Sequence, residues 1–220
     1  MNELKQETMH QLSLEFQQMV DEFFTVQCRY QAAIREVQTK LEILDDEFQM
    51  KHKRNPIHHM QTRMKSIQSM MDKLRRRQEH VSIASAVDKL TDIAGVRVIC
   101  SYIEDIYTVA DLLTSQDDIR LVRVRDYIKN PKPNGYRSLH LVIEIPVFLA
   151  EGRIMVPVEV QIRTIAMDFW ASLEHSLRYK AEGEVTEDIS HELQQIAEDI
   201  AVLDQRMQRI HDRVDAMAAV

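Results

Sequence analysis

Two carboxylates lie close to predicted strands, one just before a strand and one within a strand, at positions that suit a metal ion. Asp92 precedes the β-branched stretch 95–102, and Glu159 lies within a later alternating strand. Successive side chains of a strand point to opposite faces, so Glu159 shares one face with Gln161 and Arg163. Carboxylates at the ends or edges of neighbouring strands suit Mg²⁺, which takes oxygen ligands and keeps several waters. A turn residue at Asp92 and a solvated strand residue at Glu159 are the simpler alternatives.

Six basic side chains gather between residues 60 and 80, a segment that we interpret as a helix ending in three arginines. A helix repeats every 3.6 residues, so several of these cations can lie along one side and hold phosphates. Guanidinium groups match phosphate oxygens through paired hydrogen bonds. A solvated basic face or an RNA-contacting surface would have the same composition. The six are Arg63, Lys65, Lys73, Arg75, Arg76 and Arg77.

Glycine is too scarce for a backbone cradle around phosphate groups. The four glycines are Gly95, Gly135, Gly152 and Gly183, and they lie far apart. A Walker A loop and a G-x-G-x-x-G turn each need several glycines within a few residues, so both are excluded. If this chain handles nucleotides, its side chains must hold the phosphates.

The segment KNPKPNGYRSLHLVIEIPV holds more chemistry than a connecting turn requires. Its Asn-Gly pair is a turn signal, and Tyr136 follows directly. The tyrosine ring could stack on a nucleobase, a contact worth about 1–3 kcal/mol, and Lys132 could meet a phosphate. His140 follows at the start of the next strand. The alternative is a rigid, proline-rich turn whose tyrosine covers the core.

Charge is distributed unevenly along the 220 residues, whose net charge is −7. Residues 1–50 and 182–220 are acidic, whereas the middle carries 21 basic and 15 acidic side chains. This charge pattern indicates that an anionic ligand, if there is one, binds the middle region. No apolar run approaches the roughly 18–20 residues that span a bilayer. The N-terminus does not resemble a signal peptide, and two cysteines do not suggest a disulfide framework, so we expect a cytoplasmic protein.

Two long helices are predicted outside this middle region, over residues 10–53 and 182–220. Each carries apolar side chains in alternating steps of three and four, a pattern that packs on the core, on the other helix or on another subunit. We expect no site residue among them. The first seam is Tyr30, Ile34, Val37, Leu41, Leu44 and Phe48. The second is Ile189, Leu193, Ile196, Ile200, Leu203, Met207, Ile210, Val214 and Met217.

The middle region alternates strand and helix patterns, which predicts an α+β or α/β domain with a sheet of four or five strands. Helices are expected over 104–113 and 165–181. The stretch 119–127 alternates apolar and basic residues, so we expect a strand with one face in the core. The predicted strands are 95–102, 119–127, 139–147 and 154–163, the last two joined as a hairpin around Gly152. We divide the chain into an N-terminal helical segment (1–54), a central domain (55–181) and a C-terminal helix for packing or oligomerisation (182–220).

Three segments closely resemble the synthetase domain of the RelA/SpoT family, which makes the alarmones ppGpp and pppGpp. They are DIAGVRVIC (92–100), VRVRDYIKNPKPNGYRSLH (122–140) and VEVQIRTIAMDFWASLEH (158–175). The short length and helical flanks resemble a stand-alone small alarmone synthetase. The resemblance implies a nucleotidyltransferase-like mixed sheet of about five strands, a homotetramer and a requirement for Mg²⁺. It also implies transfer of the β,γ-pyrophosphate of ATP to the 3′-hydroxyl of GTP or GDP, with release of AMP.

The resemblance also implies roles for individual residues. Asp92 and Glu159 would bind Mg²⁺, and Glu159 would take the proton from the 3′-hydroxyl. Tyr136 would stack on guanine, so Tyr136→Phe, which keeps the ring, is expected to be mild. The ATP site would comprise Arg63, Lys65, Lys73 and Arg76 for the phosphates and Arg97 for stacking on adenine. The acceptor site would be completed by Lys132, His140 and Gln161.

Two other functions stay open at this point. An RNA-binding regulator would use the basic middle segment, would bind RNA in a salt-sensitive manner and would release no AMP from ATP and GTP. A nucleotidyltransferase would add a nucleotide and release pyrophosphate. We expect neither RNA nor a membrane as the main partner.

Regulation by product is also predictable from the resemblance. In small alarmone synthetases that their product activates, the first long helix offers basic side chains to the product phosphates. The corresponding positions here are Gln38, Glu42 and Asp45, and Asp168 replaces an asparagine near the same cleft. Carboxylates would repel a tetra- or pentaphosphorylated ligand. We therefore expect the unregulated, RelP-like branch, with little or no stimulation by pppGpp.

Overall fold

A mixed sheet of five strands organises the chain, in the order β1-β2-β5-β4-β3. The computed structural model describes residues 2–52, 54–180 and 186–218. The strands are β1 (Ile57–Met64), β2 (Ala94–Cys100), β3 (Arg120–Asp126), β4 (Leu139–Leu149) and β5 (Gly152–Thr164). β2 and β5 are parallel, whereas the other neighbouring pairs are antiparallel. The predicted α+β class, with a sheet of about five strands and a β4–β5 hairpin, is confirmed.

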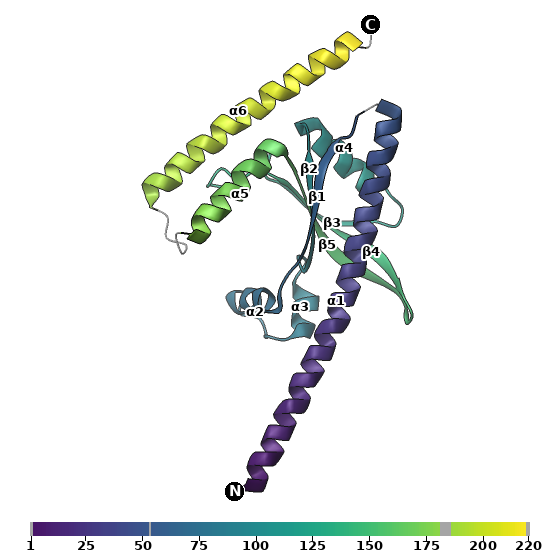
Figure 1. Ribbon diagram of the computed structural model, residues 1–220, viewed down its shortest axis with the longest axis vertical. Coiled ribbons are helices and arrows are strands. Elements are labelled where there is room, and N and C mark those ends of the chain that lie inside the picture. The colour runs from purple at the N-terminus through teal and green to yellow at the C-terminus, as the bar shows by residue number, and fades with distance from the viewer. Residues whose placement is uncertain (1, 53, 181–185, 219–220) are drawn as a thin grey trace.

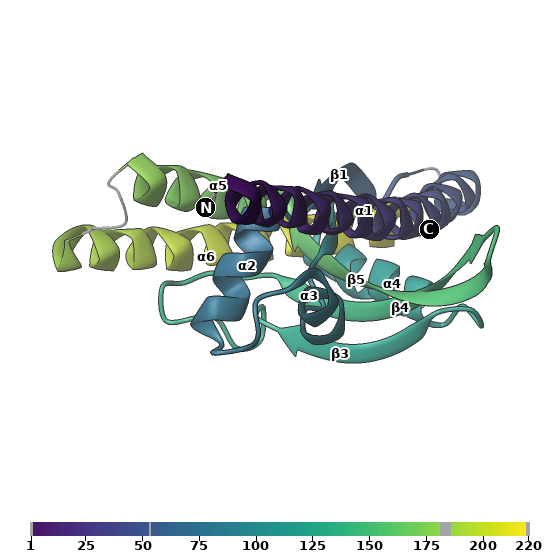
Figure 2. The same cartoon turned by 90° about the horizontal axis from the view of Figure 1, so that it is seen from below.

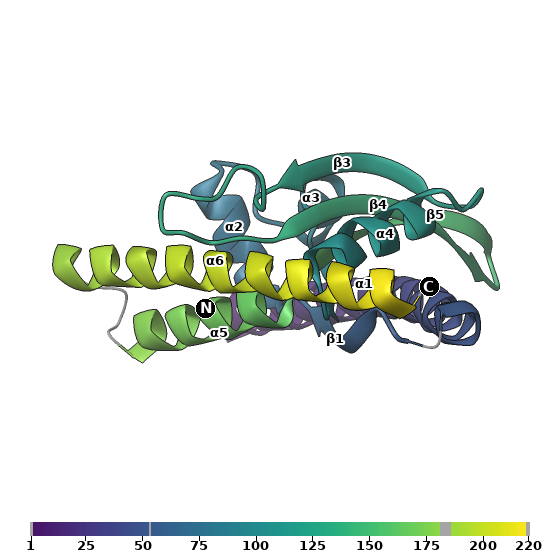
Figure 3. The ribbon, with the colours of Figure 1, turned by 90° about the horizontal axis from the view of Figure 1, so that it is seen from above.

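Helices cover both faces of this sheet. They are α1 (Asn2–His52), α2 (Ile67–Arg76), α3 (Ile83–Lys89), α4 (Ile103–Thr114), α5 (Ile165–Lys180) and α6 (Glu187–Ala218). Figure 1 shows α1 and α4 on one side of the sheet and α5 and α6 on the other. Figures 2 and 3 show α5 and α6 lying side by side, in agreement with their packing contacts. Of the helices described, none is long and apolar enough to cross a membrane.

The main core lies between the sheet and α1 with α4. In β2 the alternate residues Ala94, Val96 and Val98 are at most 1% exposed, which leaves Gly95 and Arg97 on the opposite face. The first predicted seam packs into this core, where its central residues, including Ile34 and Val37, are fully buried. Because α1 and α4 fill one face, polar side chains of the central strands gather on the other face.

The prediction of one helix over residues 60–80 is wrong for its first part. Residues 57–64 form the edge strand β1, antiparallel to β2, in which Arg63 pairs with Gly95. The helix α2 begins only at Ile67. Ser66 caps its N-terminus, because the Ser66 side chain accepts a hydrogen bond from the Ser69 amide. Pairing with a strand distant in sequence overrides local propensity, which is a weak determinant. Arg63 therefore lies on a strand, and Lys65 lies between that strand and α2.

The prediction that β3 buries one face is also wrong. All its apolar side chains are exposed, with Leu121, Val122 and Val124 between 43% and 49% accessible. β3 forms one edge of the sheet, and its register with β4 shifts between Leu121 and Arg123. Backbone pairing with β4 therefore holds this strand, and alternation in the sequence does not show whether a face is covered.

The second predicted seam lies mainly at the surface of α6. Ile189, Leu203 and Met207 are about half exposed, whereas Ala197 and Asp204 are buried instead. The division into segments 1–54, 55–181 and 182–220 stays a prediction. Three features lie outside the described residues. They are the second boundary of this division, the last residue of the helix predicted over 165–181, and Gly183.

Candidate active site

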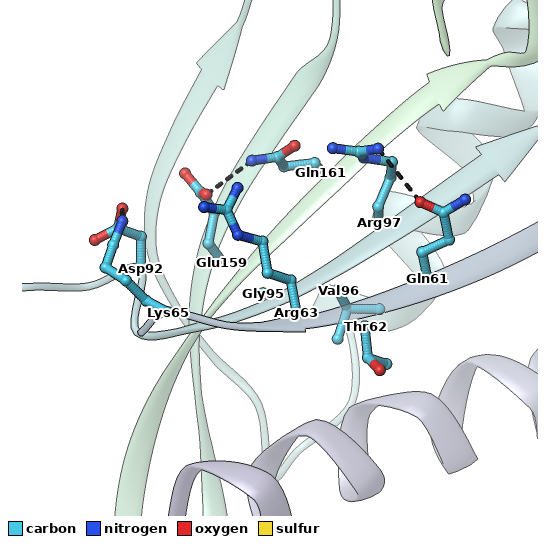
Figure 4. Close-up of a pocket in the computed structure, with 10 residues that line it drawn as sticks. All are labelled: Gln61, Thr62, Arg63, Lys65, Asp92, Gly95, Val96, Arg97, Glu159 and Gln161. Carbon is cyan, nitrogen blue, oxygen red and sulfur yellow. Dashed lines mark hydrogen bonds and ion pairs between the residues drawn. The ribbon is translucent and has the colours of Figure 1, made fainter. Parts of the chain in front are cut away.

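A pocket of about 350 Å³ opens on the sheet face opposite α1. Figure 4 shows Asp92 and Lys65 at one end, Arg97 and Gln61 at the other, and Glu159 between them. Six of the predicted site residues thus line one pocket. Its lining comprises Gln61, Thr62, Arg63, Lys65, Asp92, Gly95, Val96, Arg97, Glu159 and Gln161.

Strand register explains why these side chains meet. Arg63 pairs with Gly95, and Gly95 pairs with Glu159, so the three lie in one row across the sheet. Paired residues of neighbouring strands share a face. A Cβ at Gly95 would have only ordinary contacts, 3.7 Å from the Arg63 carbonyl oxygen and 3.8 Å from that of Glu159. A larger side chain there would enter the pocket, so glycine keeps the space between Arg63 and Glu159 open.

A second row runs parallel to the first. It crosses β1, β2, β5 and β4 through Gln61, Arg97, Gln161 and His140. The Arg97 guanidinium donates to the Gln61 Oε1 at 3.3 Å and lies 3.6 Å from the Asp168 carboxylate on α5. These contacts hold the planar guanidinium at the pocket's edge, where it can stack on an aromatic base.

Asp92 lies between two lysines. Its Oδ2 accepts hydrogen bonds from Lys65 Nζ and Lys73 Nζ, each at 2.6 Å. Burial raises the pKa of Asp92, but the hydrogen bonds and charges of the two lysines outweigh burial, so its pKa lies below its ordinary value. Its other oxygen, Oδ1, is buried and has no hydrogen-bond partner among the described residues. Asp92 is therefore an ionised carboxylate with one oxygen available to a ligand.

Glu159 faces Asp92 from the neighbouring strand. Gln161 Nε2 donates to its Oε2 at 2.8 Å, and His140 Nδ1 lies 3.5 Å from its Oε1. Burial and the charge of Asp92 raise the pKa of Glu159, whereas His140 and Gln161 lower it, and the net pKa is below the ordinary value. Glu159 is thus an ionised carboxylate, only partly accessible from the pocket.

The two carboxylates fit Mg²⁺. Mg²⁺ is commonly held by one or two carboxylates together with substrate phosphates and water. The unpartnered Oδ1 of Asp92 supplies such a ligand. Within the part of the chain that the structure describes, no group of three or more His, Cys, Asp or Glu side chains could hold a metal. A cation held here would complete its coordination with oxygens from substrate or water.

A ring-rich cluster adjoins Glu159 on the side away from Asp92. The Tyr136 hydroxyl lies 2.8 Å from His140 Nε2, and Lys132 Nζ lies 4.7 Å from the centre of the Tyr136 ring. Lys132 also lies over the Tyr127 ring, and Tyr127 meets both Tyr136 and His140 edge to face. Three predicted residues of the acceptor site are thus together, and His140 connects them to Glu159.

Lys73 and Arg76 differ although both lie on α2. Lys73 contacts the site directly, because its Nζ donates to Asp92. Arg76 is exposed, and its Nε donates to the Asp72 carbonyl oxygen at 3.4 Å. Arg76 does not line the pocket. Its predicted role in holding ATP phosphates stays a prediction.

The sequence pattern grouped Arg163 with Glu159 and Gln161 without assigning it a role, and Gly95 was not predicted to line the site. Arg163 is only 3% exposed and donates to Tyr136, Gln161 and Asp168. The alternation that groups Arg163 with Glu159 and Gln161 was the available signal, but its contacts to a distant turn were not visible. The pocket-lining position of Gly95 was equally hidden, because a single glycine in a strand has several explanations.

Comparison with known proteins identifies the family. Residues 62–184 match a family described as a region found in RelA/SpoT proteins. The chain belongs to the RelA/SpoT family. It is 46% identical to the Bacillus subtilis GTP pyrophosphokinase YwaC over 186 residues, which cover 84% of this chain and 89% of the relative. It is 37% identical to the Bacillus subtilis GTP pyrophosphokinase YjbM over 191 residues, or 86% and 89% of the two chains.

Solved structures of the family have the same architecture. Small alarmone synthetase 2 from Bacillus subtilis matches with a TM-score of 0.77 and 45% identity, over 84% of this chain and 97% of that one. Small alarmone synthetase 1 from the same organism, bound to its product pppGpp, matches with a TM-score of 0.80 and 35% identity, over 87% and 97%. The resemblance inferred from three sequence segments is therefore confirmed.

Proposed function

We propose that this chain is a GTP pyrophosphokinase, which transfers the β,γ-pyrophosphate of ATP to the 3′-hydroxyl of GTP or GDP. The carrying observation is the position of Glu159, an ionised carboxylate between the Asp92–lysine cluster and the tyrosine–histidine cluster. Two relatives with high coverage are themselves named GTP pyrophosphokinases. The products are pppGpp or ppGpp, together with AMP.

Glu159 acts as the general base in this reaction. It accepts the proton of the ribose 3′-hydroxyl, whose oxygen forms a bond to the β-phosphorus of ATP. The bond between that phosphorus and the oxygen bridging to the α-phosphate breaks, and AMP leaves with this oxygen. Such transfers depend on positioning and on neutralising charge. Both carboxylates of the site are ionised, which suits a base at Glu159 and a cation site at Asp92.

Basic side chains around Asp92 hold the ATP phosphates. Arg63 and Lys65 line the pocket directly, and Lys73 reaches it beside Asp92. Bound phosphates offer the two lysines new anionic partners in addition to Asp92. Arg97 stacks on adenine, and Arg76 joins the phosphate contacts from α2. The absence of a glycine-rich cradle from this sequence agrees with side chains as the phosphate-binding groups.

The tyrosine–histidine cluster holds the acceptor nucleotide. Tyr136 stacks on guanine, Lys132 meets a phosphate, and His140 and Gln161 complete the site beside Glu159. The distances from His140 and Gln161 to the Glu159 carboxylate support this assignment, because they bring the acceptor cluster to the base.

Mg²⁺ is the proposed cofactor, and Asp92 and Glu159 would hold it. The unpartnered, buried Oδ1 of Asp92 supports this proposal. Bound Mg²⁺ would neutralise charge on the transferred phosphates.

A cytoplasmic homotetramer is the proposed form of the enzyme. The α6 side chains Leu203, Met207, Ile210 and Val214 are 51% to 55% exposed and form a stripe suited to another subunit. The free thiols of Cys28 and Cys100 agree with a reducing compartment.

Product analysis tests the proposed function. Incubation with β- or γ-labelled ATP and GTP, followed by chromatography, should show label in pppGpp together with unlabelled AMP. Release of pyrophosphate without AMP would instead identify nucleotidyl transfer. No reaction together with salt-sensitive RNA binding would favour the RNA-binding regulator.

We further propose that pppGpp does not activate this enzyme. Three carboxylates support this proposal, and contacts within the chain hold each in place: Glu42 accepts from Gln38 at 3.0 Å, Asp45 from the Ile57 amide at 3.0 Å and Asp168 from Arg163 at 3.1 Å. As anions they would repel the phosphates of pppGpp. Initial rates with and without micromolar pppGpp should agree, whereas several-fold activation would contradict the proposal.

A further inference from the structure

Five side chains, one of them the proposed base Glu159, form a closed ring of contacts, here called the Glu159 ring. Gln161 Nε2 donates to Glu159 Oε2 at 2.8 Å, and Arg163 Nη2 donates to Gln161 Oε1 at 2.9 Å. The same Nη2 donates to the Tyr136 hydroxyl at 2.9 Å. The hydroxyl lies 2.8 Å from His140 Nε2, and His140 Nδ1 lies 3.5 Å from Glu159 Oε1.

Arginine gives this ring a direction because a guanidinium can only donate hydrogen bonds. One arm runs through Gln161. Since Arg163 must donate to its oxygen, the Gln161 amide is oriented with Nε2 toward Glu159. A reversed amide would place Nε2 against a cation and its oxygen against a carboxylate. Arg163 therefore selects the amide orientation that donates to the base.

The second arm runs through Tyr136 and His140. The Tyr136 oxygen accepts from Arg163, so its own proton is available for His140 Nε2. A neutral histidine whose Nε2 accepts must carry its proton on Nδ1, the nitrogen nearest Glu159. This arm also delivers a donor to the base, and the donor reaches the carboxylate oxygen that Gln161 leaves free.

We propose that Arg163 is a positioning residue that aims both donors at Glu159 and sets the Nδ1–H tautomer of His140. This inference rests on the proposed function for the role of Glu159 as the base. Arg163 contacts neither substrate nor the reacting atoms in this assignment. It acts through Gln161 on one arm and through Tyr136 and His140 on the other.

The placement of Arg163 suits this task. Its side chain is buried, its Nη1 donates to Asp168 at 3.1 Å, and its guanidinium lies 5.3 Å from the centre of the Tyr136 ring. Asp168 balances the buried charge, and the aromatic ring of Tyr136 restricts the motion of the guanidinium. Two donors on Glu159 stabilise the ionised carboxylate, in the direction of its lowered pKa. The Tyr136 hydroxyl is therefore a working part of the site, which revises the expectation that Tyr136→Phe is mild.

The test removes one hydroxyl, that of Tyr136, from the Glu159 ring. Tyr136→Phe keeps the aromatic ring and the Arg163–Asp168 pair. Tyr107→Phe is the matched control, since it deletes a hydroxyl that bonds Asp126 at 3.1 Å outside the site. Nitrogen-15 NMR of the imidazoles reads the tautomer directly, with the His140 signals assigned from a His140→Asn variant. Steady-state assays of AMP release give kcat and both KM values.

We expect the neutral imidazole of the wild-type His140 to carry its proton on Nδ1, and Tyr136→Phe to lose this preference. The kcat of Tyr136→Phe should fall about tenfold, the loss of one hydrogen bond, while KM for ATP stays unchanged and Tyr107→Phe matches the wild type. Arg163→Lys, with its fold checked by thermal unfolding, should lose the tautomer preference as well. Tyr136→Phe alone decides the histidine arm if the lysine variant does not fold.

Two results would overturn the proposal. They are an Nε2–H tautomer in the wild type, and a Tyr136→Phe variant with unchanged tautomer and kcat. Failure of the proposed function is distinguishable from these results. A wild type that releases no AMP would show the function to be wrong, and NMR would still measure the His140 tautomer.

Discussion

The two halves of the pocket hold their functional groups by different means. On the donor side, Lys65, Lys73 and Asp92 are partly exposed, with side chains 14%, 25% and 17% accessible, and opposite charge joins them. On the acceptor side, Glu159 and His140 are similarly accessible, at 23% and 13%, but Arg163 is only 3% exposed and donates directional hydrogen bonds to Gln161 and Tyr136. The donor side is thus suited to exchange partners when phosphates bind, whereas the acceptor side is organised in advance.

Strand position accounts for this difference. Donor-side groups come from the edge strand β1, the short helix α2 and the residues before β2. Glu159, Gln161 and Arg163 lie on β5, which pairs with strands on both sides. Two neighbouring ladders fix the β5 backbone, so side chains on it hold their mutual geometry better than flexible lysines do.

The largest effect should come from Glu159→Gln, which removes the base from the organised side. Glutamine keeps the size of the side chain but cannot accept the 3′-hydroxyl proton. AMP release should fall about 10²–10⁴-fold, while circular dichroism and the unfolding temperature remain near those of the wild type. Near-normal turnover in the folded variant would remove Glu159 from the mechanism.

Tyr136→Ala should separate the two substrates from the acceptor side. Loss of base stacking, worth about 1–3 kcal/mol, should raise KM for GTP at least fivefold while KM for ATP changes little. Steady-state kinetics with each nucleotide varied in turn measures both values. Equal effects on both nucleotides, or a loss explained by a lower unfolding temperature, would favour a structural turn.

Lys73→Ala should give the converse result from the donor side. A partly exposed, charged contact to phosphate contributes about 1.5 kcal/mol, so KM for ATP should rise about tenfold and KM for GTP should stay constant. Arg75→Ala is the matched control on the same helix, because Arg75 pairs with Asp72 in an exposed contact. Identical kinetics for the two variants would show that Lys73 does not hold ATP.

The last of these effects is on stability rather than turnover and concerns Asp92. Its lowered pKa means that the folded state favours the ionised form. This stabilisation is present above the unfolded pKa of about 3.9 and is lost as pH falls through the lower, folded pKa. Asp92→Asn should reduce the free energy of unfolding by about 1–2 kcal/mol at neutral pH.

The pH dependence of that difference is the decisive measurement. Denaturant unfolding of the wild type and Asp92→Asn should show a constant difference from pH 8 to about pH 5, which shrinks below about pH 4. A difference that grows on acidification would contradict the assignment of Asp92 as an ionised partner of Lys65 and Lys73.

Much of the acceptor side was predictable because its strands obey local rules. Period-two alternation placed Glu159, Gln161 and Arg163 on one face, and the β4–β5 hairpin preserved that arrangement. The role of Arg163 was not predictable, since it depends on Tyr136, which is 27 residues away in sequence and reaches Arg163 through its hydroxyl. The donor side was less predictable, because residues 57–64 become a strand only by pairing with β2.

The two long helices show the same limit. Their apolar periodicity and lack of internal proline determined that both would be helical. Tertiary structure alone decided that the α1 seam would be buried against the sheet while most of the α6 seam stays at the surface. Periodicity is a property of neighbouring residues, so the sequence by itself determined the elements and the faces of the strands. Burial and hydrogen-bond direction depend on groups distant along the chain, and only the folded structure decided which of them meet at Glu159.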